Sequence, residues 1–134
     1  FDGVSGMLDD LNARGVTLAV ATGKSRVGLN RALDSTALHR RFAATRCADE
    51  TFGKPHPAML HELMDELLVE PAQVVMVGDT SHDLRMAANA GVRGLGVTYG
   101  AHPEDELRAC AHQDIVRDVP SLHRWLVERT TRQN

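Results

Sequence analysis

The sequence predicts a single α/β domain over residues 1–134, with a mainly parallel sheet covered by helices on both faces. Short apolar runs rich in β-branched residues, at 16–21 and 74–77, have the length and composition of buried strands. Segments with apolar residues at helical spacing alternate with them, which is typical of strand–helix–strand units. A chain of 134 residues, 43% of them hydrophobic, is long enough to bury one sizeable core.

The first part of the chain is predicted to alternate between helix and strand. Residues 3–14 form a helix, because apolar side chains recur there at positions i, i+3, i+4 and i+7, namely Val4, Met7, Leu8 and Leu11. The strand at 16–21 leads into a loop at 22–25 and a second helix that closes near 34–35. A weaker strand follows at 42–47.

The same alternation continues to the end of the chain. Pro57 suits the first turn of a helix that ends before Pro71. The strand at 74–77 precedes a helix that Thr80 or Ser81 caps and Gly91 ends. We expect a further strand at 94–99, a short helix from Pro103, an edge strand at 115–119 and a terminal helix from Pro120.

Composition and charge argue against some classes of binding partner. Fifteen basic against 18 acidic residues give a net charge of −3, so no global field predicts binding to nucleic acid or a membrane surface. No apolar run reaches membrane-spanning length and no basic leader opens the chain. Cys47 and Cys110 lie far apart with no CxxC spacing, which fits reduced thiols in a cytoplasmic protein. The seven histidines form neither an HExxH motif nor a zinc-finger array.

The central feature of the sequence is the run 74–91, in which a strand ends at Gly78 and Asp79 and a helix carries Asp83 in its first turn. This spacing aims two carboxylates into the crevice at the strand's carboxyl end, where ligands of open α/β sheets bind. Two crowded carboxylates repel each other and favour a cation, and all-oxygen ligands suit Mg²⁺. The structural alternative is that Asp79 caps a turn and Asp83 complements the helix N-terminus.

The loop at 22–25, with the sequence Thr-Gly-Lys-Ser, is a candidate phosphate site. The Thr22 hydroxyl, the Gly23 amide and the N-terminus of the next helix together suit an anion. A nucleotide-binding P-loop is disfavoured, because that motif requires a glycine five residues before Gly23, where this chain has Leu18. The structural alternative is that Thr22 and Ser25 are helix caps.

Lys54 lies between Gly53 and Pro55 in a loop that two nearby prolines stiffen. Taken alone, a lysine in such a loop is typical of a solvated surface charge. The order of the three features favours a functional interpretation of all of them. Thr-Gly follows a strand, Gly-Lys-Pro precedes a helix, and Gly-Asp-x-x-x-Asp follows a second strand.

This series resembles the haloacid dehalogenase-like hydrolase superfamily, which has a Rossmann-like three-layer fold and consists mostly of magnesium-dependent phosphatases that act through an aspartyl-phosphate. The opening of the chain, with Phe1, Gly3, Val4 and Leu8, is similar to the phosphoglycolate-phosphatase-like branch. The resemblance implies that Thr22 and the Gly23 amide hold the phosphoryl group and that Lys54 neutralises charge on it and on the nucleophile. It implies that Asp79 binds Mg²⁺ directly, and Asp83 through water or by supporting Asp79.

The first motif of this superfamily, Asp-x-Asp-Gly-Thr at the tip of the central strand, is not in the chain. Its first aspartate is the nucleophile and its second the general acid/base. Asp2 is only superficially similar, because no strand precedes it and Val4 stands in the second aspartate's place, and Asp9 and Asp10 lie within the first helix. The cap domain of many relatives is missing as well. We therefore expect the C-terminal portion of such an enzyme, without the central strand between those that end at Thr22 and Asp79.

The resemblance thus implies a magnesium-dependent phosphatase of a small phosphorylated metabolite, with the nucleophile outside this chain and the chain alone inactive. A non-catalytic phosphate- or metal-binding module is the alternative from another class. A phosphomutase of the same superfamily is a second enzymatic alternative. A dehalogenase needs no magnesium, so Asp79 and Asp83 argue against it.

Overall fold

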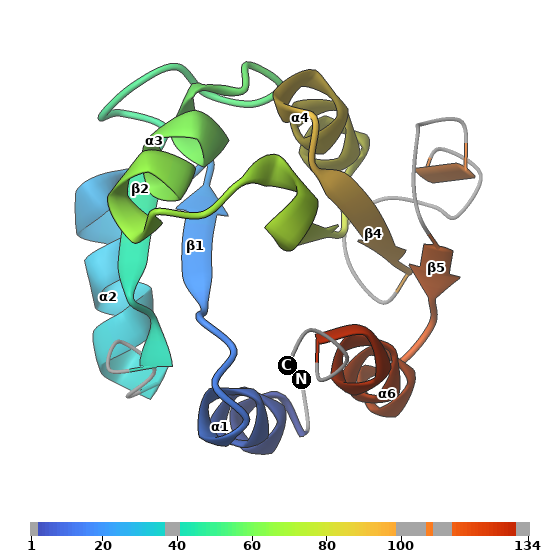
Figure 1. Cartoon of the computed structure of the whole chain (residues 1–134). Coiled ribbons are helices and arrows are strands. Elements are labelled where there is room, and N and C mark those ends of the chain that lie inside the picture. Colours follow the sequence, from blue (N-terminus) through green and yellow to red (C-terminus); the bar gives the residue numbers. More distant parts are fainter. Residues whose placement is uncertain (1–2, 37–40, 99–106, 109–113, 131–134) are drawn as a thin grey trace.

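The computed structural model describes residues 3–36, 41–98, 107–108 and 114–130. Helices and strands alternate along the chain, as the sequence predicts (Figure 1). In order, the elements are α1 (Val4–Ala13), β1 (Ala19–Thr22), α2 (Arg26–Thr36), β2 (Ala44–Cys47), α3 (Ala58–Leu67), the 3-10 turn η2 (Pro71–Gln73), β3 (Val75–Gly78), α4 (Ser81–Ala90), β4 (Arg93–Val97), β5 (Asp114–Val116) and α6 (Val119–Thr130).

Every pairing between the described strands is parallel, which confirms the predicted fold class. β1 pairs with β2, with Thr22 opposite Cys47. β3 pairs with β4, and β4 pairs with β5 on its other side. Among the described residues no pairing joins β1 to β3, so the strands form one sheet of order β1-β2 and another of order β3-β4-β5.

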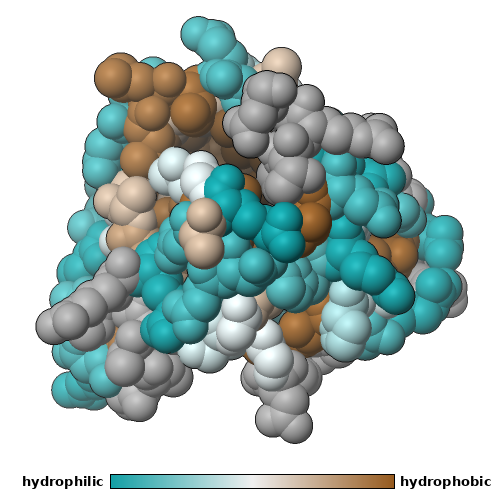
Figure 2. Space-filling view, turned by 60° about the horizontal axis from the view of Figure 1, so that its bottom comes forward, coloured by the Kyte–Doolittle hydropathy of each residue, from teal (hydrophilic) through white to brown (hydrophobic). Residues whose placement is uncertain are grey.

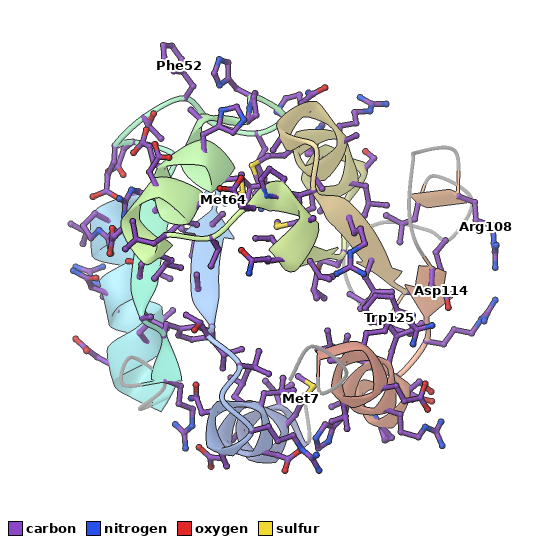
Figure 3. The ribbon with its side chains drawn as sticks, in the orientation of Figure 1. Met7, Phe52, Met64, Arg108, Asp114 and Trp125 are labelled. Carbon is purple, nitrogen blue, oxygen red and sulfur yellow. The ribbon has the colours of Figure 1, made fainter. Side chains whose placement is uncertain are left out.

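Helices cover both faces of the strands and give the molecule three layers. Val75 and Val77 of β3 pack against the core cluster of α1 and α6, while Met76, between them in sequence, packs against the cluster of α3 and α4. This period-two alternation is the signature of a strand enclosed from both sides. Met7 of α1 and Trp125 of α6 belong to the first cluster, and Figure 3 shows them on neighbouring helices.

Two strands are less buried than the sequence predicts. The sequence predicts that the runs 16–21 and 74–77 are strands buried on both faces. In the structure Ala19 is exposed, and Val75, Met76 and Val77 are only partly buried. In β4, by contrast, four consecutive residues are buried. The physical reason is the number of neighbours, since β4 has a paired strand on each side and β1 and β3 each have one. This is the arrangement expected when the strand between β1 and β3 is not part of the chain.

Several predicted boundaries shift by a few residues. β4 ends at Val97 rather than 99, and β5 ends at Val116 rather than 119. α3 ends at Leu67, because Leu68 adopts a left-handed conformation with φ of 57° before Pro71 is reached. Most of the short helix predicted from Pro103 lies outside the described residues.

The surface on the side of α1 and α6 is largely hydrophilic, with separate hydrophobic areas (Figure 2). Both helices turn apolar side chains inward, where Leu11 and Leu122 are buried in the shared cluster. None of the helices in the described part of the chain has the length and apolar character needed to cross a bilayer.

Candidate active site

The turn from β3 into α4 is fixed by a reciprocal capping box. Of the two hydroxyl residues expected as caps, Thr80 is the N-cap, and its Oγ1 accepts a hydrogen bond from Asp83 N at 3.1 Å. Asp83 Oδ2 accepts in return from Thr80 N at 3.2 Å and from Thr80 Oγ1 at 3.0 Å. These bonds satisfy N–H groups that a helix start otherwise leaves unpaired. Gly91 ends the helix with φ of 74°, as predicted.

Gly78 allows this turn to lie directly against the end of β3. A Cβ added at Gly78 would lie 2.6 Å from Asp83 Cγ and 2.7 Å from Asp83 Oδ2, and closer still to Asp83 Cβ. Only glycine therefore fits here without displacing the Asp83 side chain. Asp83 is itself buried, with 3% of its surface exposed.

Lys54 forms an ion pair with Asp83, through Nζ and Oδ1. Its side chain is 19% exposed, so the interpretation of Lys54 as a solvated surface charge is wrong. The loop that carries it is fastened to α4 as well, because Asn89 Nδ2 donates to Pro55 O at 2.9 Å. The Lys54 ammonium group therefore lies at the β3–α4 turn.

Asp79, Thr22 and Gly23 stand at strand ends. Asp79 follows the last residue of β3 and directly precedes the Thr80 cap. Thr22 is the last residue of β1, and its Oγ1 accepts from Lys24 N at 3.1 Å. Because β1 and β2 are parallel, Thr22 and the loop that leads to Lys54 leave the sheet at the same edge. The structure thus brings Lys54 and Asp83 into contact. The roles of both residues in binding phosphate and Mg²⁺ stay predictions, as do those of Thr22, Gly23 and Asp79.

One set of residues at this edge is missing from the sequence-based candidates. Arg26, at the start of α2, pairs with Glu50 at 2.7 Å, and its backbone N–H is bound by the Asp49 carboxylate. The Arg26 guanidinium holds the pKa of the Glu50 carboxyl below its ordinary value. Spacing along the sequence gives no sign of this contact, which depends on the register that sets Thr22 opposite Cys47.

The donors around the β3–α4 turn suit a magnesium ion. Mg²⁺ typically takes one or two carboxylates and completes its shell with water and substrate phosphate. Asp79 and Asp83 supply two carboxylates, while no group of three or more metal-binding side chains occurs in the described part of the chain. The Asp83 carboxylate accepts hydrogen bonds from Thr80 and pairs with Lys54, and direct coordination of a cation by Asp79, which precedes the Thr80 cap, stays a prediction.

Cys47 does not fit the role of a nucleophile. It is fully buried at the end of β2, and burial raises the pKa of its thiol. A reactive cysteine requires a thiolate and access to substrate, and this position provides neither. Any nucleophile must therefore come from another group.

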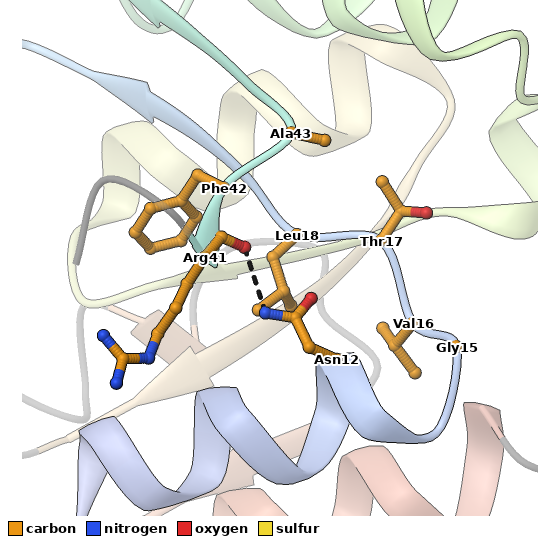
Figure 4. Close-up of a pocket in the computed structure, with 8 residues that line it drawn as sticks. All are labelled: Asn12, Gly15, Val16, Thr17, Leu18, Arg41, Phe42 and Ala43. Carbon is orange, nitrogen blue, oxygen red and sulfur yellow. Dashed lines mark hydrogen bonds between the residues drawn. The ribbon is translucent and has the colours of Figure 1, made fainter.

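A separate pocket lies away from these loops. It is found where the chain enters β1 and β2, at their amino ends, and Asn12 Nδ2 donates to Arg41 O at 3.3 Å across it (Figure 4). Its lining residues are Asn12, Gly15, Val16, Thr17, Leu18, Arg41, Phe42 and Ala43. None of them is a predicted site residue, and ligands of open α/β sheets bind at the opposite, carboxyl end of the strands.

Comparison with known proteins identifies the family of the chain and several relatives. A family model described as "Haloacid dehalogenase-like hydrolase" matches residues 1–97. A relative from Dickeya dadantii, "Probable phosphatase IndB", is 42% identical over 117 residues, covering 87% of this chain and 51% of its own length. A "Phosphoglycolate phosphatase" from Agrobacterium fabrum is 35% identical over 101 residues, covering 75% of this chain and 43% of its own length.

The fold is similar to that of solved structures. The crystal structure of a predicted phosphatase from Clostridium acetobutylicum superposes with a TM-score of 0.88 at 28% identity, covering 96% of this chain and 60% of that one. The chain thus spans about half the length of the curated relatives it matches.

Proposed function

Since the chain belongs to the haloacid dehalogenase-like hydrolase family, we propose that the protein containing it is a magnesium-dependent phosphatase of small phosphate esters, similar to phosphoglycolate phosphatases. The observation that carries the proposal is the ion pair of the partly buried Lys54 with the buried Asp83, in the turn that Asp79 begins at the end of β3. Relatives named as phosphatases, among them a phosphoglycolate phosphatase, add support.

In the proposed mechanism the chain binds and neutralises the phosphoryl group. The Thr22 hydroxyl and the Gly23 amide donate hydrogen bonds to two phosphoryl oxygens, and Lys54 stabilises the negative charge that they share. Phosphoryl transfer depends chiefly on such positioning and charge stabilisation. The attacking aspartate and the general acid/base would belong to a segment outside this chain. Attack on phosphorus breaks the bond to the ester oxygen, which leaves as the alcohol after the general acid protonates it, and gives an aspartyl-phosphate. Water, deprotonated by the same acid/base residue, then attacks phosphorus and releases orthophosphate and the free aspartate.

Asp79 would hold Mg²⁺ directly, and Asp83 would support it through water or through its contact with the Thr80 turn. A bound Mg²⁺ would neutralise phosphate charge and orient the ester. Asp83 also holds Lys54, so the same carboxylate would link the cation site to the lysine.

The main test is the rate at which the protein containing this chain releases phosphate from p-nitrophenyl phosphate with magnesium. Lys54→Gln should slow turnover by roughly 10²–10³-fold, the usual effect of losing one group that stabilises transition-state charge. Arg41→Gln is the matched control, because Arg41 is also a partly buried cation paired with an aspartate, but lies before β2 at the opposite strand end. Equal rates in the two variants would contradict the role of Lys54.

The metal is tested separately. Asp79→Asn should raise the magnesium concentration needed for half-maximal rate, and chelation should abolish turnover of the unmodified protein. A rate that is insensitive to both treatments would contradict the magnesium proposal. Residues 1–134 alone should release no phosphate, since we propose that the attacking group is outside them, and robust turnover that is lost on changing Asp2, Asp9 or Asp10 would refute this.

A further inference from the structure

Arg26, the first residue of α2, is bound entirely to the strand β2 and the loop after it. Its Nε donates to Glu50 Oε2 at 3.2 Å and its Nη2 to Glu50 Oε1 at 2.7 Å. Nη1 donates to Thr45 Oγ1 at 2.7 Å, and Nη2 also reaches Thr45 O at 3.2 Å. All three guanidinium nitrogens are thus in use, in the forked geometry that makes arginine–carboxylate contacts strong and directional.

Backbone groups reinforce the same connection. Both carboxylate oxygens of Asp49 accept from Arg26 N, at 3.1 and 3.2 Å, so that a residue of the loop after β2 caps α2. Ala48 N donates to Lys24 O at 3.3 Å. Glu50 Oε1 additionally accepts from Cys47 N at 2.9 Å, which fixes the carboxylate that Arg26 binds.

These contacts join the two loops on which the proposed phosphate site depends. Thr22 and Gly23 lie three to four residues before Arg26, and Lys54 lies four residues after Glu50. At its far end the second loop is held by α4, through Lys54 with Asp83 and Pro55 with Asn89. The segment between Asp49 and Pro55 is therefore fastened to α2 on one side and to α4 on the other.

We propose that Arg26, acting through Asp49 and Glu50, is a positioning residue that sets the separation between the Thr22–Gly23 loop and Lys54. This inference rests on the proposed function, since the separation matters only if both loops bind one phosphoryl group. Arg26 does not contact the substrate in this role, because its guanidinium is occupied by Glu50 and Thr45.

The test compares Arg26→Gln and Arg26→Lys with Arg41→Gln in the protein that contains this chain. Arg41 is a matched control, because it binds Asp9 with the same forked geometry, at 2.6 and 3.2 Å, away from the phosphate loops. The measurements are kcat and KM for p-nitrophenyl phosphate, the Kd of orthophosphate, and the thermal midpoint of unfolding. Arg26→Gln should lower kcat and weaken orthophosphate binding by about 10–100-fold, as small misplacements of binding groups do. Arg26→Lys, which keeps the charge and one bond to Glu50, should recover part of this loss.

A double variant separates positioning from a general loss of structure. In the Lys54→Gln background, Arg26→Gln should have a smaller effect than in the parent, because the ammonium group that it positions is gone. Full additivity of the two effects would overturn the inference. Normal kcat and normal orthophosphate binding in Arg26→Gln would also overturn the inference. In that case the proposed function would still stand, provided that the parent protein hydrolyses the ester. A parent that neither binds orthophosphate nor hydrolyses the ester would refute the proposed function, and the inference with it.

Discussion

Gly78→Ala is the substitution whose effect the structure specifies most closely. The new methyl group would lie 2.6 Å from Asp83 Cγ and 2.7 Å from Oδ2, in a place that the buried Asp83 side chain already fills. Overpacking of this kind costs roughly 1–3 kcal/mol. If Asp83 is also pushed out of place, the capping box with Thr80 is lost as well, at about 1 kcal/mol. We therefore expect a loss of about 2–4 kcal/mol where both effects combine.

Urea unfolding followed by circular dichroism measures this loss, as a lower midpoint at unchanged m-value. The control is Gly6→Ala, the same change on the exposed face of α1, where an added Cβ meets nothing within 4 Å. Alanine is the better helix former, so Gly6→Ala should stabilise the protein by roughly 0.5–1 kcal/mol. If Gly78→Ala unfolds at the same urea concentration as the parent, the reasoning about the packing of α4 on β3 is wrong.

Three further substitutions test single features of the fold. Thr80→Ala removes the N-cap of α4 and should cost about 1 kcal/mol in urea unfolding, less than Gly78→Ala. Leu68→Gly relieves the left-handed residue that ends α3 and should raise the free energy of unfolding by roughly 0.5–1 kcal/mol, measured as a higher urea midpoint, since Leu68 is 90% exposed and loses little packing. Hydrogen bonds from His123 and Arg14 lower the pKa of the Asp10 carboxyl, and the bond to His123 joins α1 to α6. This contact therefore stabilises the fold at pH values above the pKa of Asp10 in the unfolded chain. The stabilisation is lost as the pH falls through the lower pKa of Asp10 in the folded protein. Asp10→Asn should therefore make the free energy of unfolding depend less on pH in the acid range. An unchanged pH dependence would exclude a contribution from Asp10.

The fold class and most elements could be predicted from the sequence, because they follow from local patterns. The continuous apolar run at 74–77, rich in β-branched residues, identifies β3, and the hydroxyl, acidic and glycine residues around α4 identify both of its ends. Lys54 and Asp83 were both identified as candidates, and the structure joins them in an ion pair. Short-range spacing and strand ends were sufficient for these features.

The remaining features depend on contacts between distant segments. Arg26 and Glu50 are 24 residues apart, and neither belongs to a local motif that marks it as functional. Only the register of β1 on β2 brings the two loops together. The exposure of Ala19 has a similar origin, because the sequence pattern specifies a strand but not how many neighbours it has.

The position of Asp83 connects stability with the proposed chemistry. Its carboxylate accepts two hydrogen bonds from Thr80 and pairs with Lys54, so it fixes the first turn of α4 and the lysine at once. The two interpretations of Asp83 in the sequence, helix capping and a role at the cation site, are therefore compatible. The proposed function assigns direct coordination to Asp79, one residue before the Thr80 cap, and a supporting role to Asp83. One buried carboxylate thus caps α4 and holds Lys54 at the same time.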